Sequence, residues 1–429
     1  MTMRGATFLS GCLLLCLSGC SLNTTVRYVD MSPPATATTP IEEQDLLDIG
    51  VSVFDANVPD DFDDRVNLNV TPEIREAEAN YLSFFLKNLL QSTGNWGAVR
   101  VIPRPSYAVD VTIEGQIIHS DGERLIVAIK VTDARGEVWI DEIYETLASK
   151  YAYDDQIPKS IDPFQTTYKR VANQMLEKFE SLTELDRYEI RTTAELQFAR
   201  SFSTEAFSNH VTKSEEDGTV KIARLPTEDD PMLQRIRKIR EREYLFIDTL
   251  DEYYENFSDK MYRPYHNWRE GSYKDAIAYR EARNKVRTRL LTGTAMIISG
   301  AAMQRSSSNL TEYSGYANVI GGAGYVLGGI NARTRMDEHA GALRELGIST
   351  SAEISPHTIE LENATVSLIG SVDEQYESLR KILRRLYYED FGLEIPAELY
   401  EDGDFTESDT VASQDAVEEA LEASLGLEE

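Results

Sequence analysis

The sequence predicts an α+β protein, with an N-terminal α/β domain that contains an antiparallel meander and a mainly helical region after it. Short apolar runs at residues 49–54 and 99–102 flank a segment with helical spacing, and three segments of alternating polarity follow between residues 107 and 146. Further along the chain the apolar residues recur at helical spacing. This pattern predicts a long heptad helix from Pro231 and a glycine-rich helical hairpin over residues 290–332.

The chain has 429 residues, enough for two or three domains. Changes in composition divide it into six segments. These are a lipoprotein signal peptide (1–19), a Thr/Ala/Pro-rich tether (20–44), the α/β domain (45–185), a helical domain with the glycine-rich hairpin (186–348), a β-hairpin plus helix (349–390) and an acidic tail (391–429).

The first twenty residues have the pattern of a secretion signal. One basic residue, Arg4, precedes an apolar run from Phe8 to Leu17, and small residues follow it. The sequence Leu-Ser-Gly-Cys that ends at Cys20 resembles the lipobox of bacterial lipoproteins. This resemblance implies cleavage before Cys20 and a diacylglycerol on its sulfur, and Ser21 after it favours the outer membrane of a Gram-negative bacterium. An ordinary secretion signal that happens to contain cysteine is the alternative.

Local signals also predict the elements of the α/β domain. Thr71 and Pro72 begin a helix that Gly94 ends. Ser120–Glu123 and Asp133–Glu137 are polar, glycine-containing turns between alternating segments, which indicates a meander. A second helix then follows Asp162 and Pro163.

The meander sequence GQIIHSDGERLIVAIKVTDARGEVWIDEIYE carries a second resemblance. With the strand and helix before it, it resembles the α/β domain of periplasmic lipoproteins of the CsgG type, of penicillin-binding-protein activators and of the TolB amino-terminal type. The shared elements are a glycine-bearing strand, a turn, and an Asp-x-x-Gly-Glu turn, here Asp133–Glu137. The resemblance covers residues 45–185 and implies no catalytic residues.

The helical region starts with a predicted helix at Asp186–His210, and a polar, loop-like segment follows it at residues 211–228. Asp230 and Pro231 predict a helix start, and Pro264 predicts its end. A seam at heptad spacing predicts a helical hairpin or a short coiled coil. Its members are Ile236, Ile239, Glu243, Phe246, Leu250, Tyr253 and Phe257.

Small residues recur at spacings of 4-3-4-4 near the end of this region, and on a helix they would form one stripe. A small-residue stripe lets helix backbones approach closely, as in a glycine zipper. A buried hairpin in water is one interpretation, and insertion into a membrane or self-association is the other. Each apolar run has about 14 residues, fewer than the ~20 of a membrane span. The stripe consists of Ala317, Gly321, Gly324, Gly328 and Ala332.

The charge pattern excludes one class of partner and leaves another open. The formal net charge is −30, which argues against nucleic acid. The basic run Arg235–Arg242 is interpreted as a solvated helix face, with docking of the acidic tail or of an acidic partner as the alternative. The five histidines lack metal-ligand spacing, so we expect neither a metal nor a cofactor.

Together these observations predict a lipid-anchored, non-catalytic scaffold or assembly subunit of an envelope complex. Its expected partners are the membrane, through the N-terminal lipid, and envelope proteins or further copies of the chain. A component of an oligomeric export pore is the alternative. A cell-wall-acting envelope enzyme is the third hypothesis, and it would require a deep pocket lined by Glu, Asp or His.

Overall fold

The computed structural model describes residues 31–303, except residues 69, 150, 155, 159, 160 and 228, and then residues 357–360, 365–368, 371–396 and 399. Helices and a mixed five-stranded sheet confirm the predicted α+β class. The signal peptide, the second half of the glycine-rich hairpin and nearly all of the acidic tail lie outside the described residues.

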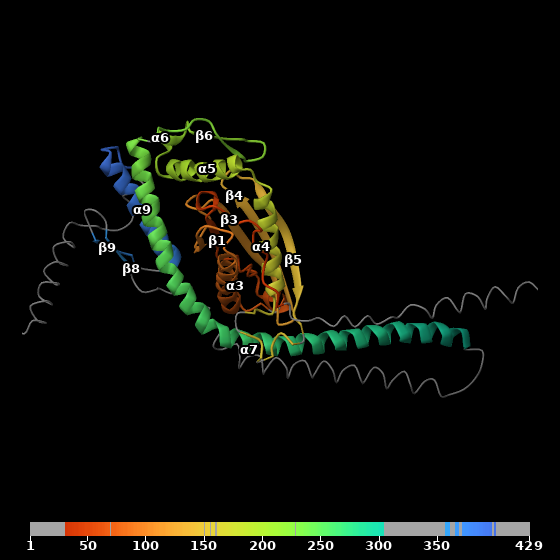
Figure 1. The fold of residues 1–429 in the computed structure, drawn as a ribbon. Helices are drawn as coiled ribbons and strands as arrows, with labels where there is room; N and C mark the ends of the chain where they lie inside the picture. The colour runs from red at the N-terminus through yellow and green to blue at the C-terminus, as the bar shows by residue number, and fades with distance from the viewer. Residues whose placement is uncertain are drawn as a thin grey trace, which may run out of the picture.

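The elements follow one another in the order shown in Figure 1. The strands are β1 (Ile49–Ser52), β2 (Val99–Ile102), β3 (Val111–Ser120), β4 (Arg124–Asp133), β5 (Val138–Leu147), β6 (Val211–Lys213), β7 (Val220–Ile222), β8 (His357–Glu360) and β9 (Thr365–Leu368). The helices are the 3-10 turn η1 (Glu43–Asp45), α2 (Phe62–Leu68), α3 (Pro72–Thr93), α4 (Gln165–Glu180), α5 (Glu184–Phe202), α6 (Thr204–Phe207), α7 (Pro231–Met303) and α9 (Val372–Asp390).

The main sheet has the strand order β2-β1-β3-β4-β5. Strand β1 pairs in parallel with both neighbours, so that Ile49 lies beside Val99 on one side and Val111 on the other. Strands β3, β4 and β5 form the predicted antiparallel meander, in which Val127 lies opposite Tyr144. The parallel part requires the α3 crossover, whereas the meander needs only short turns.

Helices α3 and α4 bury the apolar residues of the sheet in a first hydrophobic cluster. Helix α3 begins at Pro72, whose missing N–H costs nothing at that position, and ends at Gly94, which has a φ of 67°. The same cluster contains Phe257, Met261 and Tyr265 of α7. Apolar burial therefore joins the predicted helical region directly to the α/β part.

Helix α7 contradicts the prediction that Pro264 ends it. The helix runs for 73 residues, with Pro264 inside it. A proline in a helix interior removes one hydrogen bond and bends the helix, and Figure 1 shows such a change of direction along α7. Burial of Met261, Tyr265 and Trp268 on both sides of the proline offsets the lost hydrogen bond.

The first half of α7 lies in a second hydrophobic cluster. Its predicted heptad positions Ile236, Ile239 and Leu250 are buried there with side chains of β2, α5 and α9. In this part of α7, then, the apolar face packs within the chain. The hairpin predicted between residues 352 and 371 is present as β8 and β9, and the helix predicted after it is α9.

One further prediction was wrong. The polar segment 211–228 was expected to be a loop, but it contains an antiparallel ribbon of β6 and β7. Only Val211 and Val220 are buried in it, against Leu196 of α5. Strands of three residues with so little apolar alternation leave almost no signal in the sequence.

Candidate functional site

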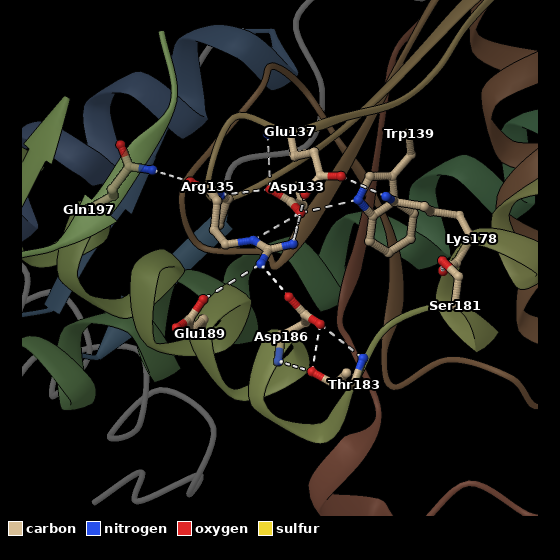
Figure 2. A network of polar contacts seen from close by, with 11 residues as sticks. Asp133, Arg135, Glu137, Trp139, Lys178, Ser181, Thr183, Asp186, Glu189 and Gln197 are labelled. Atoms are coloured by element: carbon tan, nitrogen blue, oxygen red, sulfur yellow. Dashed lines mark hydrogen bonds and ion pairs between the residues drawn. The ribbon is translucent and has the colours of Figure 1, made fainter. Parts of the chain in front are cut away.

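The turn between β4 and β5 is the centre of a polar network that joins the sheet to α5 (Figure 2). The Arg135 guanidinium lies 3.0 Å from the carboxylate of Asp133 and 3.0 Å from that of Glu137. It also lies 3.1 Å from Asp186 and 3.7 Å from Glu189, both on α5. One arginine thus bridges two carboxylates of the meander and two of the helical region.

Backbone geometry explains the residue types of this turn. One oxygen of the buried Asp133 accepts hydrogen bonds from the backbone N–H groups of Arg135 (2.8 Å) and Glu137 (3.2 Å). Its other oxygen accepts one from the indole of Trp139 at 3.1 Å. Gly136 has a φ of 82°, a left-handed backbone conformation that residues other than glycine rarely adopt. The turn itself therefore explains the Asp and the Gly of the Asp-x-x-Gly-Glu pattern, whereas the Glu137 side chain pairs with Arg135 and Lys178.

Asp186 has a second role as part of the α5 cap. Its carboxylate accepts hydrogen bonds from the backbone N–H (2.9 Å) and the hydroxyl (2.6 Å) of Thr183, whose Oγ1 accepts from the Asp186 N–H. The hydrogen bonds from Thr183, together with the one from Arg135, lower the pKa of Asp186 to about 2. The carboxylate is therefore ionised at neutral pH, as the contact with Arg135 requires.

A fully buried ion pair joins α7 to the start of α4. Arg269 is 1% exposed, and its Nη1 lies 2.9 Å from Oδ2 of Asp162, whose side chain is fully buried. The guanidinium also lies over the ring of Tyr265, 4.0 Å from its centroid. The other oxygen of Asp162 accepts a hydrogen bond from the Phe164 N–H at 2.9 Å. A buried charge without its partner is costly, so this pair fixes the position of α7.

Glu78 of α3 adds a polar contact in the same region. It is 1% exposed and lies 3.3 Å from Arg75 on its own helix. Its carboxylate accepts hydrogen bonds from the hydroxyls of Ser120, at the end of β3, and Tyr265 of α7. Three elements that are far apart in sequence therefore meet at one carboxylate.

Gly122 lets α7 approach the β3–β4 turn. A Cβ atom at this residue would lie 1.8 Å from the carbonyl oxygen of Arg269 and 2.4 Å from the backbone nitrogen of Tyr273. No side chain fits in that space. The helix backbone from Arg269 to Tyr273 therefore contacts the turn backbone directly, at the residue that forms the buried ion pair.

A polar groove of about 570 Å³ is the place where an enzymatic site would be sought. Burial raises the pKa of Asp110 in this groove to about 6. The geometry gives two of its carboxylates a role in the fold, because Asp110 accepts a hydrogen bond from the Asp48 N–H and Asp48 accepts one from the Ala98 N–H, both at 2.9 Å. The described residues that line the groove include no histidine, cysteine or serine.

The site residues predicted from the sequence lie elsewhere in the chain. Cys20 and the stripe of Ala317, Gly321, Gly324, Gly328 and Ala332 fall outside the described residues. The described part of the structure therefore does not test them, and they stay predictions.

The interpretation of the basic run as a solvated helix face was wrong for three partly buried arginines. Arg235 is 11% exposed and pairs with Asp390 of α9. Arg240 donates a hydrogen bond of 2.8 Å to the carbonyl of Ala108. Half-exposed Arg237 pairs with Glu195 of α5 at 2.6 Å. These arginines bind the rest of the chain and hold the first half of α7 in place.

Sequence reasoning missed Arg269, Asp162 and Gly122 as a unit. A signal was present, because the apolar spacing of α7 continues past Pro264 through Tyr265 and Trp268. That continuation placed Arg269 beside a buried face. Its partner could not be inferred, since Asp162 lies 107 positions away in the sequence.

Comparison of the chain with protein-family models, with curated proteins and with solved structures finds no match. In the part of the chain that the structure describes, no three or more His, Cys, Asp or Glu side chains gather in a group that could hold a metal ion. Among the same residues, none of the helices combines the length and the apolar character needed to cross a membrane.

Proposed function

We propose that the protein is a lipid-anchored, non-catalytic scaffold or assembly subunit on the periplasmic face of a Gram-negative outer membrane. The observation that carries the proposal is the Leu-Ser-Gly-Cys tetrad that ends at Cys20, directly after an apolar run of signal-peptide length. Ser21 supports the outer membrane as the destination. The lipid determines the location, and the folded part presents surfaces to partners.

The architecture supports a scaffold role. A partly exposed ion pair between Arg135 and Asp186 joins the sheet to α5, and the buried pair between Arg269 and Asp162 joins α7 to the segment before α4. Helix α7 has 73 residues, and at 1.5 Å per residue it is about 110 Å long. Figure 1 shows its later part extending away from the sheet. A long helix fixed at one end can hold partners at a distance from the anchored body.

The far end of α7 leads into the glycine-rich hairpin predicted over residues 290–332. We propose that the small-residue stripe of this hairpin supports self-association or shallow membrane insertion, as a glycine zipper does. The proposed partners are envelope proteins or further copies of the chain, and they would bind elsewhere than at the heptad face of α7, because Ile236, Ile239 and Leu250 are buried within the chain. The proposed assembly needs no nucleic acid, metal or cofactor.

A component of an oligomeric export pore is the second candidate. The stripe and the resemblance of residues 45–185 to the CsgG-type pore lipoprotein favour it. Extraction of the lipidated protein in mild detergent, followed by mass measurement and electron microscopy, separates the two candidates. Closed rings of uniform size would support the pore, and a monomer would exclude it.

The anchor itself is tested by fractionation of cells that produce Cys20→Ala. We expect this variant to leave the membrane fraction, because the thioether to the lipid cannot form. Cys16→Ala is the matched control, because Cys16 lies four residues earlier in the same apolar segment and should not affect anchoring. If both variants stay in the membrane fraction, Cys20 is not the anchor, and the glycine-rich hairpin becomes the candidate for membrane attachment.

A further inference from the structure

A groove of about 790 Å³ lies where α3, α7 and the start of α4 meet the N-terminal strap, defined here as residues 31–37. Met31, the first described residue, forms part of its wall and is 56% exposed. The chain that comes from Cys20 therefore enters the structure at the groove. Any partner of this groove must share the space with that chain.

Contacts of the strap with α4 set a direction and a register. The Ala35 N–H donates a 2.9 Å hydrogen bond to the side-chain oxygen of Asn173, and Lys169 donates one of 2.7 Å to the Ser32 hydroxyl. From Ser32 to Ala35 the strap advances three residues while its contacts on α4 advance one helical turn, from Lys169 to Asn173. One further turn toward the start of α4 reaches Gln165, which lines the groove.

The two long walls of the groove differ in character. Helix α3 contributes an aromatic wall that includes Phe84 and Phe85. Helix α7 contributes an acidic wall of Asp251, Glu255 and Asp259, which are spaced four residues apart and so share one face. Asp251 pairs with Lys87 at 2.9 Å.

The acidic wall has unbalanced charge. Glu255 and Asp259 are exposed, and neither forms an ion pair with any other side chain that the structure describes. The groove therefore fits an extended segment that carries an apolar side chain next to a cation.

The chain supplies such a segment directly before Met31, with the sequence Val-Arg-Tyr-Val-Asp over residues 26–30. Arg27 is the only basic residue between Arg4 and Arg65. We propose that Val26–Asp30 docks in this groove, with Arg27 against Glu255 and Asp259 and Tyr28 against the aromatic wall. The register of the strap, the position of Met31 and the complementary charge all lead to this occupant.

This docking would determine how the body stands on the membrane, a consequence that rests on the proposed lipid anchor. Only the five residues from Ser21 to Thr25 would then remain free between Cys20 and the docked segment. Fully extended they span at most about 18 Å. The groove face of the body would be held close to the bilayer, and the long tether suggested by composition would be mostly bound.

The test uses thiol cross-linking in the full-length chain with Cys12, Cys16 and Cys20 replaced by alanine, so that no native thiol remains. Val29→Cys, which alternates with Tyr28 and so lies on the same side of an extended segment as Arg27, is paired with Ser258→Cys, a residue of α7 that lines the groove. The matched control pairs Val29→Cys with Thr166→Cys, since Thr166 is exposed and follows the groove residue Gln165 without lining the groove itself. We expect the groove pair to oxidise at least about tenfold faster, because docking raises the effective concentration of the two thiols.

Charge reversal separates docking from simple proximity. Arg27→Glu should slow cross-linking of the groove pair about two- to fivefold, and Glu255→Arg in the same chain should restore it. Equal rates for the groove pair and the control pair would overturn the proposal. A disulfide-linked dimer of a chain that carries Ser258→Cys alone would also overturn it, because a second copy would then occupy the groove. The cross-linked chain carries no lipid, so failure of the membrane anchor would leave this result unaffected.

Discussion

Arg269→Met would leave the Asp162 carboxylate buried without its cation. Methionine keeps an unbranched apolar side chain of similar length, so the main loss is the charge. Both partners are at most 1% exposed and lie 2.9 Å apart, and the described partner that remains for Asp162 is the Phe164 N–H. Removing one partner of such a pair costs about 3–5 kcal/mol of unfolding free energy.

Urea unfolding followed by tryptophan fluorescence measures this loss, since Trp268 lies next to Arg269 in α7 and is buried. Lys274→Met is the matched control. Lys274 lies on the same helix and pairs with Glu270 at 2.6 Å, but its side chain is 69% exposed. An exposed ion pair at i, i+4 spacing contributes about 0.3–0.5 kcal/mol to the free energy of unfolding. The control variant should therefore unfold at nearly the same urea concentration as the parent protein.

The two variants decide whether the buried pair fixes α7 to the α/β part. If Arg269→Met costs no more than Lys274→Met, the pair does not hold the helix, and the reasoning fails. Asp162→Asn combined with Arg269→Met should recover part of the loss, because the double variant no longer buries an unpaired charge. A double variant less stable than Arg269→Met would contradict the electrostatic explanation.

Two further predictions concern the turns of the meander. Gly122→Ala places a Cβ 1.8 Å from the Arg269 carbonyl oxygen, so α7 must move. We expect the free energy of unfolding, measured with urea or heat, to fall by about 1–3 kcal/mol. An unchanged free energy of unfolding would show that α7 does not contact this turn. The pKa of Asp186 is about 2 when folded, below the ~3.9 of an unfolded aspartate, so its stabilisation is present above about pH 4 and is lost as the pH falls toward 2. Asp186→Asn should therefore flatten the dependence of unfolding free energy on pH in that window, and an unchanged slope there would refute the role of Asp186.

Local sequence signals were sufficient for the α/β part of the fold. Strand β2 has the bounds that its apolar run predicted, and α3 begins at Pro72 and ends before Gly94 as expected. These signals act over a few residues: proline suits the first turn of a helix, glycine adopts the left-handed conformation at its end, and alternation matches the pleat of a strand. Such effects are visible without knowledge of the neighbours in space.

Long-range packing decided the points where the predictions failed. Pro264 interrupts the hydrogen bonds of α7, yet the helix continues because its buried face on both sides of the proline packs in the first cluster. The arginines at 235 and 240 looked like solvated charges, but their partners, Asp390 and Ala108, are remote in sequence. A basic residue on a helix has the same local pattern whether its partner is water or a buried acid.

The sequence by itself determined the α+β class, the succession of the five sheet strands and of helices α3 and α4, and the hypothesis that Cys20 is the anchor. Only the tertiary structure decided that α7 packs on both clusters and that Arg269, Asp162 and Gly122 form one contact site. It also showed that the strap leads into an acidic and aromatic groove. The physical reason is that periodicity and caps are short-range properties, whereas the cost of burying a charge depends on which distant group reaches it.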